Sequence, residues 1–184
     1  SLLYAASGTL SFEELGDFAA QNIEAGRPLP LLFLAGALLV LSALGFKVAS
    51  VPFQVWVPDV YEGAPTPVTA FFSVASKSAG FAALARILFE ILGSLENERR
   101  VLFSLFAAMT LLYGNLGALL QKDIKRLLGY SSIGHAGFLL VALASQKLEG
   151  ESALFYYLLA YAVTNLAAFL VVSVVEGAEQ SQNI

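Results

Sequence analysis

Two long stretches without charged residues most constrain how this chain can fold. Val101 to Leu120 and Ala153 to Val175 contain no Asp, Glu, Lys or Arg. Each is close to the ~20 apolar residues that a helix needs to cross the hydrocarbon core of a bilayer. Over the whole chain 58% of residues are hydrophobic and 13% are charged, whereas soluble domains have about 45–50% apolar and about 25% charged residues. The sequence therefore predicts an all-α, polytopic transmembrane helix bundle.

Composition also excludes several classes of function. The chain has no cysteine, which excludes disulfides, zinc–thiolate sites and iron–sulfur clusters bound by this chain. Any redox chemistry would therefore occur in a partner. A net charge of −4 and a pI near 4.9 leave no basic patch for nucleic acid.

The apolar segments predict a single transmembrane domain over residues 1–184, with about five spans and the end of a preceding one. A polar loop is expected from Thr9 to Arg27. Because the chain begins at Ser1 within an apolar segment and shows no targeting signal, we expect a piece of a longer protein. Short connections between the later spans favour antiparallel neighbours in an up-and-down bundle. The expected helical segments are 1–8, 29–61, 67–93, 101–120, 127–144 and 153–175.

The segment 29–61 is predicted to be a broken helix. Pro52 and Pro58 interrupt a stretch that remains largely hydrophobic, and each proline removes an intrahelical hydrogen bond and clashes with the preceding turn. At membrane depth such a break is tolerated only where protein or a water-filled cavity satisfies the freed backbone groups. We predict a break after Ala49 and a half-helix from about Phe53 to Tyr61.

Lys47 and Lys77 are the strongest candidates for a functional role. A charged side chain inside a spanning segment costs between ~2.5 and more than ~10 kcal/mol, and usually marks a pathway or a partner. Lys77 is expected near mid-depth, and Lys47 only if its helix continues past the break. A lysine in a low-dielectric site releases its proton more readily than in water, which suits a proton carrier. The alternative for each is a snorkelling or permanently paired lysine.

His135 is the only histidine of the chain and lies in the middle of GYSSIGHAGFLLVAL, with Ser131 one helical turn before it. An imidazole changes charge near neutral pH and is suited to proton relay. Alternatively, His135 hydrogen-bonds a neighbouring helix as a neutral group, since Gly134 and Gly137 permit close approach. The sequence supports both interpretations.

A polar stripe is predicted on the last span, where Tyr157, Tyr161, Thr164 and Asn165 recur at helical spacing. Such residues either hydrogen-bond neighbouring helices or line a chain of water molecules. We favour interhelical hydrogen bonds.

Two sets of charged residues have structural interpretations that we favour. Arg86 and Glu90 are four residues apart and can pair on one helix face. Asp59 and Glu62, beside the end of the half-helix, are either interfacial capping residues or a site of proton uptake, and we favour capping.

Two long strings carry a family resemblance. GFKVASVPFQVWVPDVYEGAPTPVTAFFSVASKSAGFAALAR resembles the central signature of subunit N of NADH-quinone oxidoreductase, the antiporter-like membrane subunit of complex I, and QKDIKRLLGYSSIGHAGFLLVAL resembles the next signature of that family. The resemblance implies inverted repeats, each with a broken helix. Lys47 would be the lysine of the broken seventh helix, Lys77 that of the eighth, and His135 a polar position of the tenth. Gln54 departs from the family's frequent P-F-H-x-W string, which puts a protonation role there in doubt.

The resemblance implies a proton-translocating subunit in which Lys47, Lys77 and His135 transfer protons. NADH oxidation and quinone reduction elsewhere in the complex would drive the transfer. The chain itself would bind no cofactor and no metal, whereas NADH, FMN, iron–sulfur clusters and quinone would bind in partner subunits. It would cross the bacterial inner membrane several times, in contact with lipid and with other membrane subunits of complex I.

Two other functions are compatible with parts of the sequence. A subunit of a multisubunit sodium/proton antiporter would share the broken helix and the lysines, but the string PDVYEGAPTP favours the oxidoreductase. A non-conducting membrane scaffold would gain nothing from the desolvation cost of Lys47 and Lys77, so these residues disfavour it.

Overall fold

The computed structural model describes residues 1–145 and 147–182, and this part of the chain contains helices and no strands. Five helices are long and apolar enough to cross a membrane. This confirms the predicted all-α, polytopic architecture. The spans are Leu31–Val48, Thr66–Ile91, Gly93–Leu119, Ile124–Ala144 and Glu149–Ala178.

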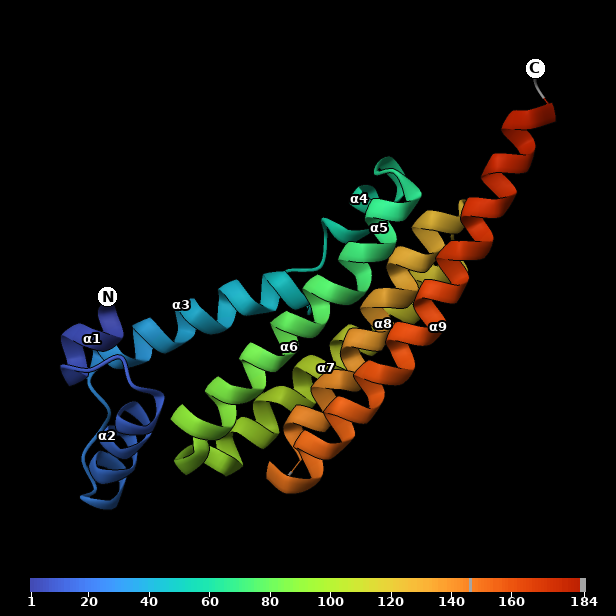
Figure 1. The fold of residues 1–184 in the computed structure, drawn as a ribbon. Helices are drawn as coiled ribbons and strands as arrows, with labels where there is room; N and C mark the ends of the chain where they lie inside the picture. Colours follow the sequence, from blue (N-terminus) through green and yellow to red (C-terminus); the bar gives the residue numbers. More distant parts are fainter. Residues whose placement is uncertain (146, 183–184) are drawn as a thin grey trace.

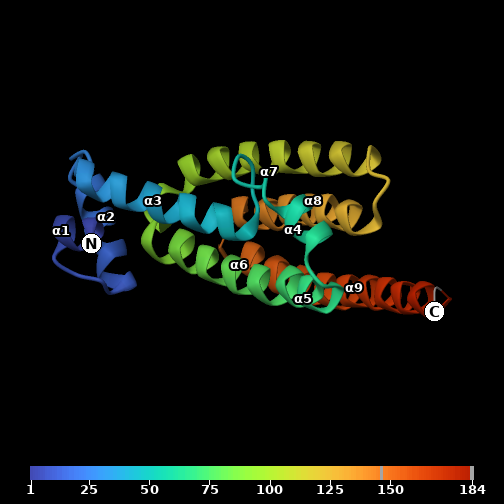
Figure 2. The ribbon, with the colours of Figure 1, turned by 90° about the horizontal axis from the view of Figure 1, so that it is seen from above.

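The last four spans run side by side as a bundle, which both views show (Figures 1 and 2). The second span is a continuous helix that contains two π-helical turns, η1 and η2. Helix α3 leads from the N-terminal elements toward the segment before α4 (Figure 1). The elements concerned are α3 (Leu31–Val48), α5 (Thr66–Phe71), η1 (Phe72–Ser76), α6 (Lys77–Arg86), η2 (Ile87–Ile91), α7 (Glu96–Leu119), α8 (Ile124–Ala144) and α9 (Lys147–Gln182).

The spans start earlier than their charge-free cores. The predicted starts at 101, 127 and 153 become Glu96, Ile124 and Lys147. The first turns of these helices carry charged or polar residues, so they lie outside the apolar runs from which the starts were predicted. The helices thus extend past the apolar core, and α9 also projects beyond α8 at its C-terminal end (Figure 1).

Glycines bring α7 and α8 into close contact. Gly114 of α7 lies against the backbone of Gly134, and Gly137 of α8 lies against Leu111, so closely that neither could carry a Cβ without a shift of its neighbour. Small residues allow this approach in membrane helices. The two glycines that flank His135 therefore pack against α7.

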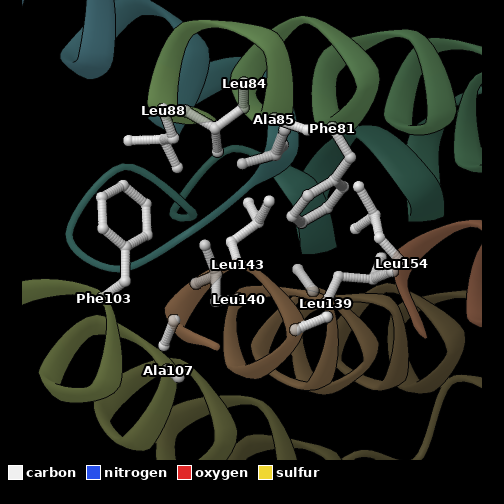
Figure 3. Packing of buried hydrophobic residues seen from close by; sticks show 14 of the residues in the cluster. Phe81, Leu84, Ala85, Leu88, Phe103, Ala107, Leu139, Leu140, Leu143 and Leu154 are labelled. Carbon is white, nitrogen blue, oxygen red and sulfur yellow. The ribbon is translucent and has the colours of Figure 1, made fainter. Parts of the chain in front are cut away.

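A buried apolar cluster joins α6 and η2 to α7, α8 and α9 (Figure 3). Its members on α6 and η2 recur every three or four residues, which places them on one face of the helix. Lys77 precedes Phe81 by one turn and so shares this inward face. The labelled members are Phe81, Leu84, Ala85, Leu88, Phe103, Ala107, Leu139, Leu140, Leu143 and Leu154.

The predicted break follows α3, which ends at Val48. Ala49 adopts a left-handed conformation with φ of 63°, and the Val51–Pro52 peptide bond is cis. The Val51 backbone N–H donates to Thr110 Oγ1 of α7 at 3.1 Å. A side chain of another span thus supplies a partner for a backbone group in the break, as a break at membrane depth requires.

The half-helix after the break is shorter than predicted. Helix α4 spans Val57–Gly63 rather than starting near Phe53. Single turns precede it, because the Phe53 N–H donates to the Ser50 carbonyl and the Val57 N–H to the Gln54 carbonyl. The Trp56 indole N–H also donates to the Phe46 carbonyl at 3.1 Å, which ties the turn back to α3.

The predicted polar loop from Thr9 to Arg27 is wrong, because it contains helix α2 (Phe12–Glu24), which follows α1 (Leu2–Ser7). Leu15 and Ala19, one turn apart, are fully buried in a small cluster below α3. The opposite face carries the charges that suggested a loop, so α2 is an amphipathic helix. Its exposed acidic residues are Glu13, Glu14, Asp17 and Glu24.

Candidate functional site

Lys77 is buried near the middle of the second span, directly after the π-helical turn η1. Its side chain is 4% exposed, and its Nζ donates to the Ser132 carbonyl oxygen and to Ser132 Oγ of α8, both at 2.5 Å. Within residues 1–145 and 147–182, Lys77 forms no ion pair with a carboxylate. Because it is buried among other helices, Lys77 is not a snorkelling residue. Single π-helical turns inside α-helices frequently occur at functional sites.

The Ser132 hydroxyl beside Lys77 lies within hydrogen-bond distance of two tyrosine hydroxyls. The Tyr61 hydroxyl of α4 lies 3.1 Å from Ser132 Oγ, and the Tyr161 hydroxyl of α9 lies 3.0 Å from it. The Lys77 Nζ is 5.6 Å from the centroid of the Tyr161 ring. We call these residues, Lys77, Ser132, Tyr61 and Tyr161, the Lys77 cluster. All are buried, so a lysine and three hydroxyls share a site enclosed by helices.

His135 borders this cluster from the next turn of α8. Its Nδ1 lies 2.7 Å from the Tyr157 hydroxyl of α9, and its ring centroid is 5.0 Å from that of Tyr161. Tyr161 therefore contacts both predicted residues, Lys77 and His135. The bond to Tyr157 supplies the interhelical partner of the packing interpretation, and the position beside Tyr161 suits the relay interpretation.

The polar stripe on α9 faces the neighbouring helices, as favoured from the sequence. Tyr157 and Tyr161 bond α8, and Asn165 Nδ2 donates to Ser73 Oγ of η1 at 2.5 Å. Thr164 differs, because its exposed hydroxyl donates to a carbonyl of its own helix at 2.9 Å. The prediction of interhelical hydrogen bonds is confirmed for three residues of the stripe and is wrong for Thr164.

Lys47 lies in the last turn of α3 and is exposed in this chain. Its aliphatic stem rests on Gly80 of α6, where Cγ would be 3.3 Å from a Cβ added to that glycine. Gly80 is one turn beyond Lys77. The structure thus places the stem of Lys47 on the helix that carries Lys77, but outside the buried cluster.

The carboxylates of α4 form ion pairs. Arg126 NH1 of α8 lies 2.7 Å from Asp59 Oδ1 and 2.7 Å from Glu62 Oε2. Helix α4 has no side-chain N-cap bond, so the favoured interpretation of these residues as caps is wrong. Lys125 adds a bond to the Ala64 carbonyl at 2.6 Å. Two basic residues of the QKDIKR string therefore hold the end of the half-helix.

The predicted pair on the second span is present. Arg86 Nε lies 3.1 Å from Glu90 Oε1, and Arg86 NH2 lies 3.3 Å from Glu90 Oε2. Arg86 is exposed and is remote in sequence from the turn that carries Lys77. The predicted pairing is therefore confirmed, and its structural role stays a prediction.

The sequence did not indicate Ser132 or Tyr61. Ser131 lies one helical turn before His135 and stands out in the sequence, but Ser132 is the serine whose hydroxyl bonds Lys77. A signal was available, since Ser132 lies three residues before His135 and so on nearly the same face. For Tyr61 the signal is weaker, because its position depends on how the half-helix folds back onto α8.

With this geometry established, the chain can be compared with known proteins. The family described as "NADH:quinone oxidoreductase/Mrp antiporter, TM" matches residues 1–184. NADH-quinone oxidoreductase subunit N 1 of Herpetosiphon aurantiacus is 47% identical over 178 residues, which cover 96% of this chain and 36% of that protein. The chain thus spans little more than a third of the length of that relative.

Solved structures share the fold. A chain of the Mrp complex from Dietzia sp. DQ12-45-1b matches with a TM-score of 0.79 and 25% identity, over 93% of this chain and 30% of that chain. A chain of respiratory complex I from Thermus thermophilus with bound Aureothin matches with a TM-score of 0.69 and 38% identity, over 94% and 35% respectively. The chain therefore belongs to the transmembrane family of NADH:quinone oxidoreductases and Mrp antiporters.

Proposed function

We propose that this chain is the proton-conducting part of a subunit N of NADH-quinone oxidoreductase, a translocase of the bacterial inner membrane. Lys47, Lys77 and His135 transfer the protons. NADH oxidation and quinone reduction take place in partner subunits, which hold the FMN and the iron–sulfur clusters. Other membrane subunits of the complex are the partners of this chain. The naming of its relatives and the match to a chain of complex I support this proposal.

The observation that carries the proposal is the setting of Lys77. A charged group in a spanning helix is expensive and normally serves a pathway or a partner. A carboxylate beside it would fix the charge, whereas the groups that surround Lys77 are hydroxyls and a carbonyl. A hydroxyl accepts a hydrogen bond from an ammonium group and donates one to a neutral amine. The site thus accommodates both protonation states of Lys77.

Lys47 supplies a means of coupling. Its stem rests on α6 beside Gly80, one turn from Lys77, and two like charges repel each other more strongly as the local dielectric falls. A change in the position or charge of Lys47 therefore changes how firmly Lys77 retains its proton. The broken helix permits such a change, because Lys47 is followed at once by the non-helical segment 49–56.

The test is Lys77→Ala in the full-length subunit within the assembled complex. We expect less proton pumping per electron, because loss of a proton-transfer group slows the step it serves by ~100-fold or more. The readout is the ratio of protons pumped to NADH oxidised in sealed vesicles. Lys122→Ala, which truncates an exposed lysine of the turn before α8, is the matched control. An unchanged ratio in Lys77→Ala would rule out Lys77 as an obligatory carrier.

A second function, a subunit of a sodium/proton antiporter, is favoured by one observation. The TM-score is higher for the Mrp chain than for the complex I chain, 0.79 against 0.69. Sequence identity points the other way, 25% against 38%. Neighbouring genes distinguish the two, since genes for redox subunits support the oxidoreductase and genes for antiporter subunits support the antiporter. A non-conducting scaffold is disfavoured by the burial of Lys77.

A further inference from the structure

The Ser132 hydroxyl can satisfy its three polar neighbours in more than one arrangement. Its Oγ lies within hydrogen-bond distance of Lys77 Nζ, of the Tyr61 hydroxyl and of the Tyr161 hydroxyl. A hydroxyl has one proton to donate and two lone pairs that accept. Ser132 therefore donates to one neighbour and accepts from the others. Which neighbour accepts the Ser132 proton depends on whether Lys77 and the two phenols act as donors or as acceptors.

The charge on Lys77 decides this arrangement. An ammonium group only donates, so a charged Lys77 donates to Ser132 Oγ and the Ser132 proton must go to Tyr61 or Tyr161. A neutral amine has a free lone pair, so Ser132 can donate to Nζ and accept from both phenols. Loss of a proton from Lys77 thus opens a second orientation of the Ser132 hydroxyl that a charged Lys77 does not allow.

We propose that Ser132 is the relay through which Lys77 exchanges its proton with the α9 side of the cluster; this inference rests on the proposed function of Lys77 as a carrier. An N–H bond of Lys77 breaks as an O–H bond forms at Ser132 Oγ. The original Ser132 proton passes to the Tyr161 oxygen, and the phenol proton passes by way of water to the imidazole of His135, whose ring lies 5.0 Å from that of Tyr161 between centroids. Lys77 becomes a neutral amine, His135 becomes an imidazolium ion, and Ser132 and Tyr161 end neutral.

The role of relay can be separated from that of holding Lys77 in place. The Ser132 backbone carbonyl also accepts from Nζ, at 2.5 Å, and this bond remains when the side chain is changed. The close approach of α7 and α8 is made at Gly114, Gly134 and Gly137, which a substitution of Ser132 leaves unchanged. Ser132→Ala therefore removes the hydroxyl while leaving Lys77 an acceptor on α8 and the helix packing intact.

The experiment compares Ser132→Ala with Ser131→Ala in the full-length subunit of the assembled complex. Ser131 is the adjacent serine of the same helix and is partly exposed. We expect Ser132→Ala to lower the NADH-driven pumping rate by ~100-fold, the lower end of the range for loss of a proton-transfer group, and to change the solvent deuterium isotope effect. Ser131→Ala should retain the parent values. Ser132→Thr keeps the hydroxyl and should retain most of the rate.

A double-mutant cycle tests the path. If Ser132 and Tyr161 act in sequence, the variant that combines Ser132→Ala with Tyr161→Phe should pump as slowly as Ser132→Ala alone, because coupled residues are non-additive. Multiplicative losses, or the same loss in Ser131→Ala, would overturn the relay. Should Ser132→Ala fail to assemble, Tyr161→Phe alone must slow pumping and Ser132→Thr must not, and any other result rejects the proposal.

Lys77→Ala, measured in parallel, separates the two proposals. A large loss in Lys77→Ala together with the parent rate in Ser132→Ala rejects the relay and leaves the proposed function intact. The parent rate in both variants rejects the proposed function. A loss in both, with the parent rate in Ser131→Ala, supports both proposals.

Discussion

Lys77 and Lys47 are lysines of neighbouring spans, but their surroundings differ. Lys77 lies within a continuous helix and is enclosed by α4, α8 and α9, at 4% exposure. Lys47 lies in the last turn of a helix that breaks after Val48, and its side chain is exposed in this chain. One lysine is positioned by side-chain hydrogen bonds and the other by the path of the backbone. The Lys77 region is therefore suited to holding and passing a proton, and the Lys47 region to moving a charge.

Their polar groups are also used differently. Around the break, hydrogen bonds stabilise the break itself: Val51 N–H bonds Thr110, and Trp56 bonds the Phe46 carbonyl while stacking on the Phe46 ring at 5.4 Å between centroids. Around Lys77, the Ser132 hydroxyl and carbonyl bond the ammonium group. Substitutions in the first region should affect stability first, and substitutions in the second should affect proton transfer first.

The largest effect is expected for Lys77→Arg. Arginine keeps a positive charge at all relevant pH values and cannot act as a proton carrier. The proton-transfer step that Lys77 serves should slow by ~100-fold. The pumping rate of the assembled complex should fall with it, as measured by acidification of vesicles on addition of NADH. A parent-like rate would show that a fixed charge at this position is sufficient.

Lys47→Arg should cause a smaller loss. The exposed position of Lys47 leaves room for a guanidinium group, so a positive charge can still move with the break. The guanidinium group does not release its proton, however. The same vesicle assay gives the comparison. Equal losses in both arginine variants would contradict the distinction between the Lys77 region and the Lys47 region. Full activity in Lys47→Arg would show that a fixed charge at position 47 is sufficient.

Thr110→Val should act on stability. Valine has nearly the shape of threonine but cannot accept the Val51 N–H, which is part-buried. A fully buried unsatisfied donor costs about 1–3 kcal/mol, so we expect a loss near the lower end of that range. Thermal unfolding of the detergent-solubilised complex measures the effect. Thr110→Ser keeps the acceptor and is the control. If the valine variant were no less stable than the serine variant, the α7 hydroxyl would not be what holds the break.

The smallest effect is expected for Asp59→Asn. Arg126 would lose one of its two carboxylate partners and retain Glu62, and exposed ion pairs contribute little to stability. We expect pumping and thermal stability close to those of the parent. A marked fall in pumping would instead identify Asp59 as a site of proton uptake, and would extend the Lys77 region to the α4 end of the bundle.

Much of the fold could be predicted because a bilayer imposes simple rules. The charge-free runs located spans, and Pro52 and Pro58 located the break. Helix α2 is not predicted because its four acidic residues are also typical of a polar loop. Its helical spacing of apolar residues, with Leu15 and Ala19 one turn apart and inward, was the better signal.

The candidate site was predicted in part. Lys77 and His135 stand out in a sequence because a lysine within a span and a single histidine are rare. Ser132 and Tyr61 do not, because serine and tyrosine are common in membrane helices and their roles depend on which helix lies opposite. The different exposure of Lys47 and Lys77 follows from tertiary packing around α6, which no local pattern encodes.

The most direct test of the account is a structure of the assembled complex at a resolution that shows ordered water. We predict water molecules that link Lys47 to the Lys77 cluster and the cluster to His135, with each successive pair of polar atoms within hydrogen-bond distance. A dry, apolar gap between Tyr161 and His135, present in every state of the turnover cycle, would contradict it.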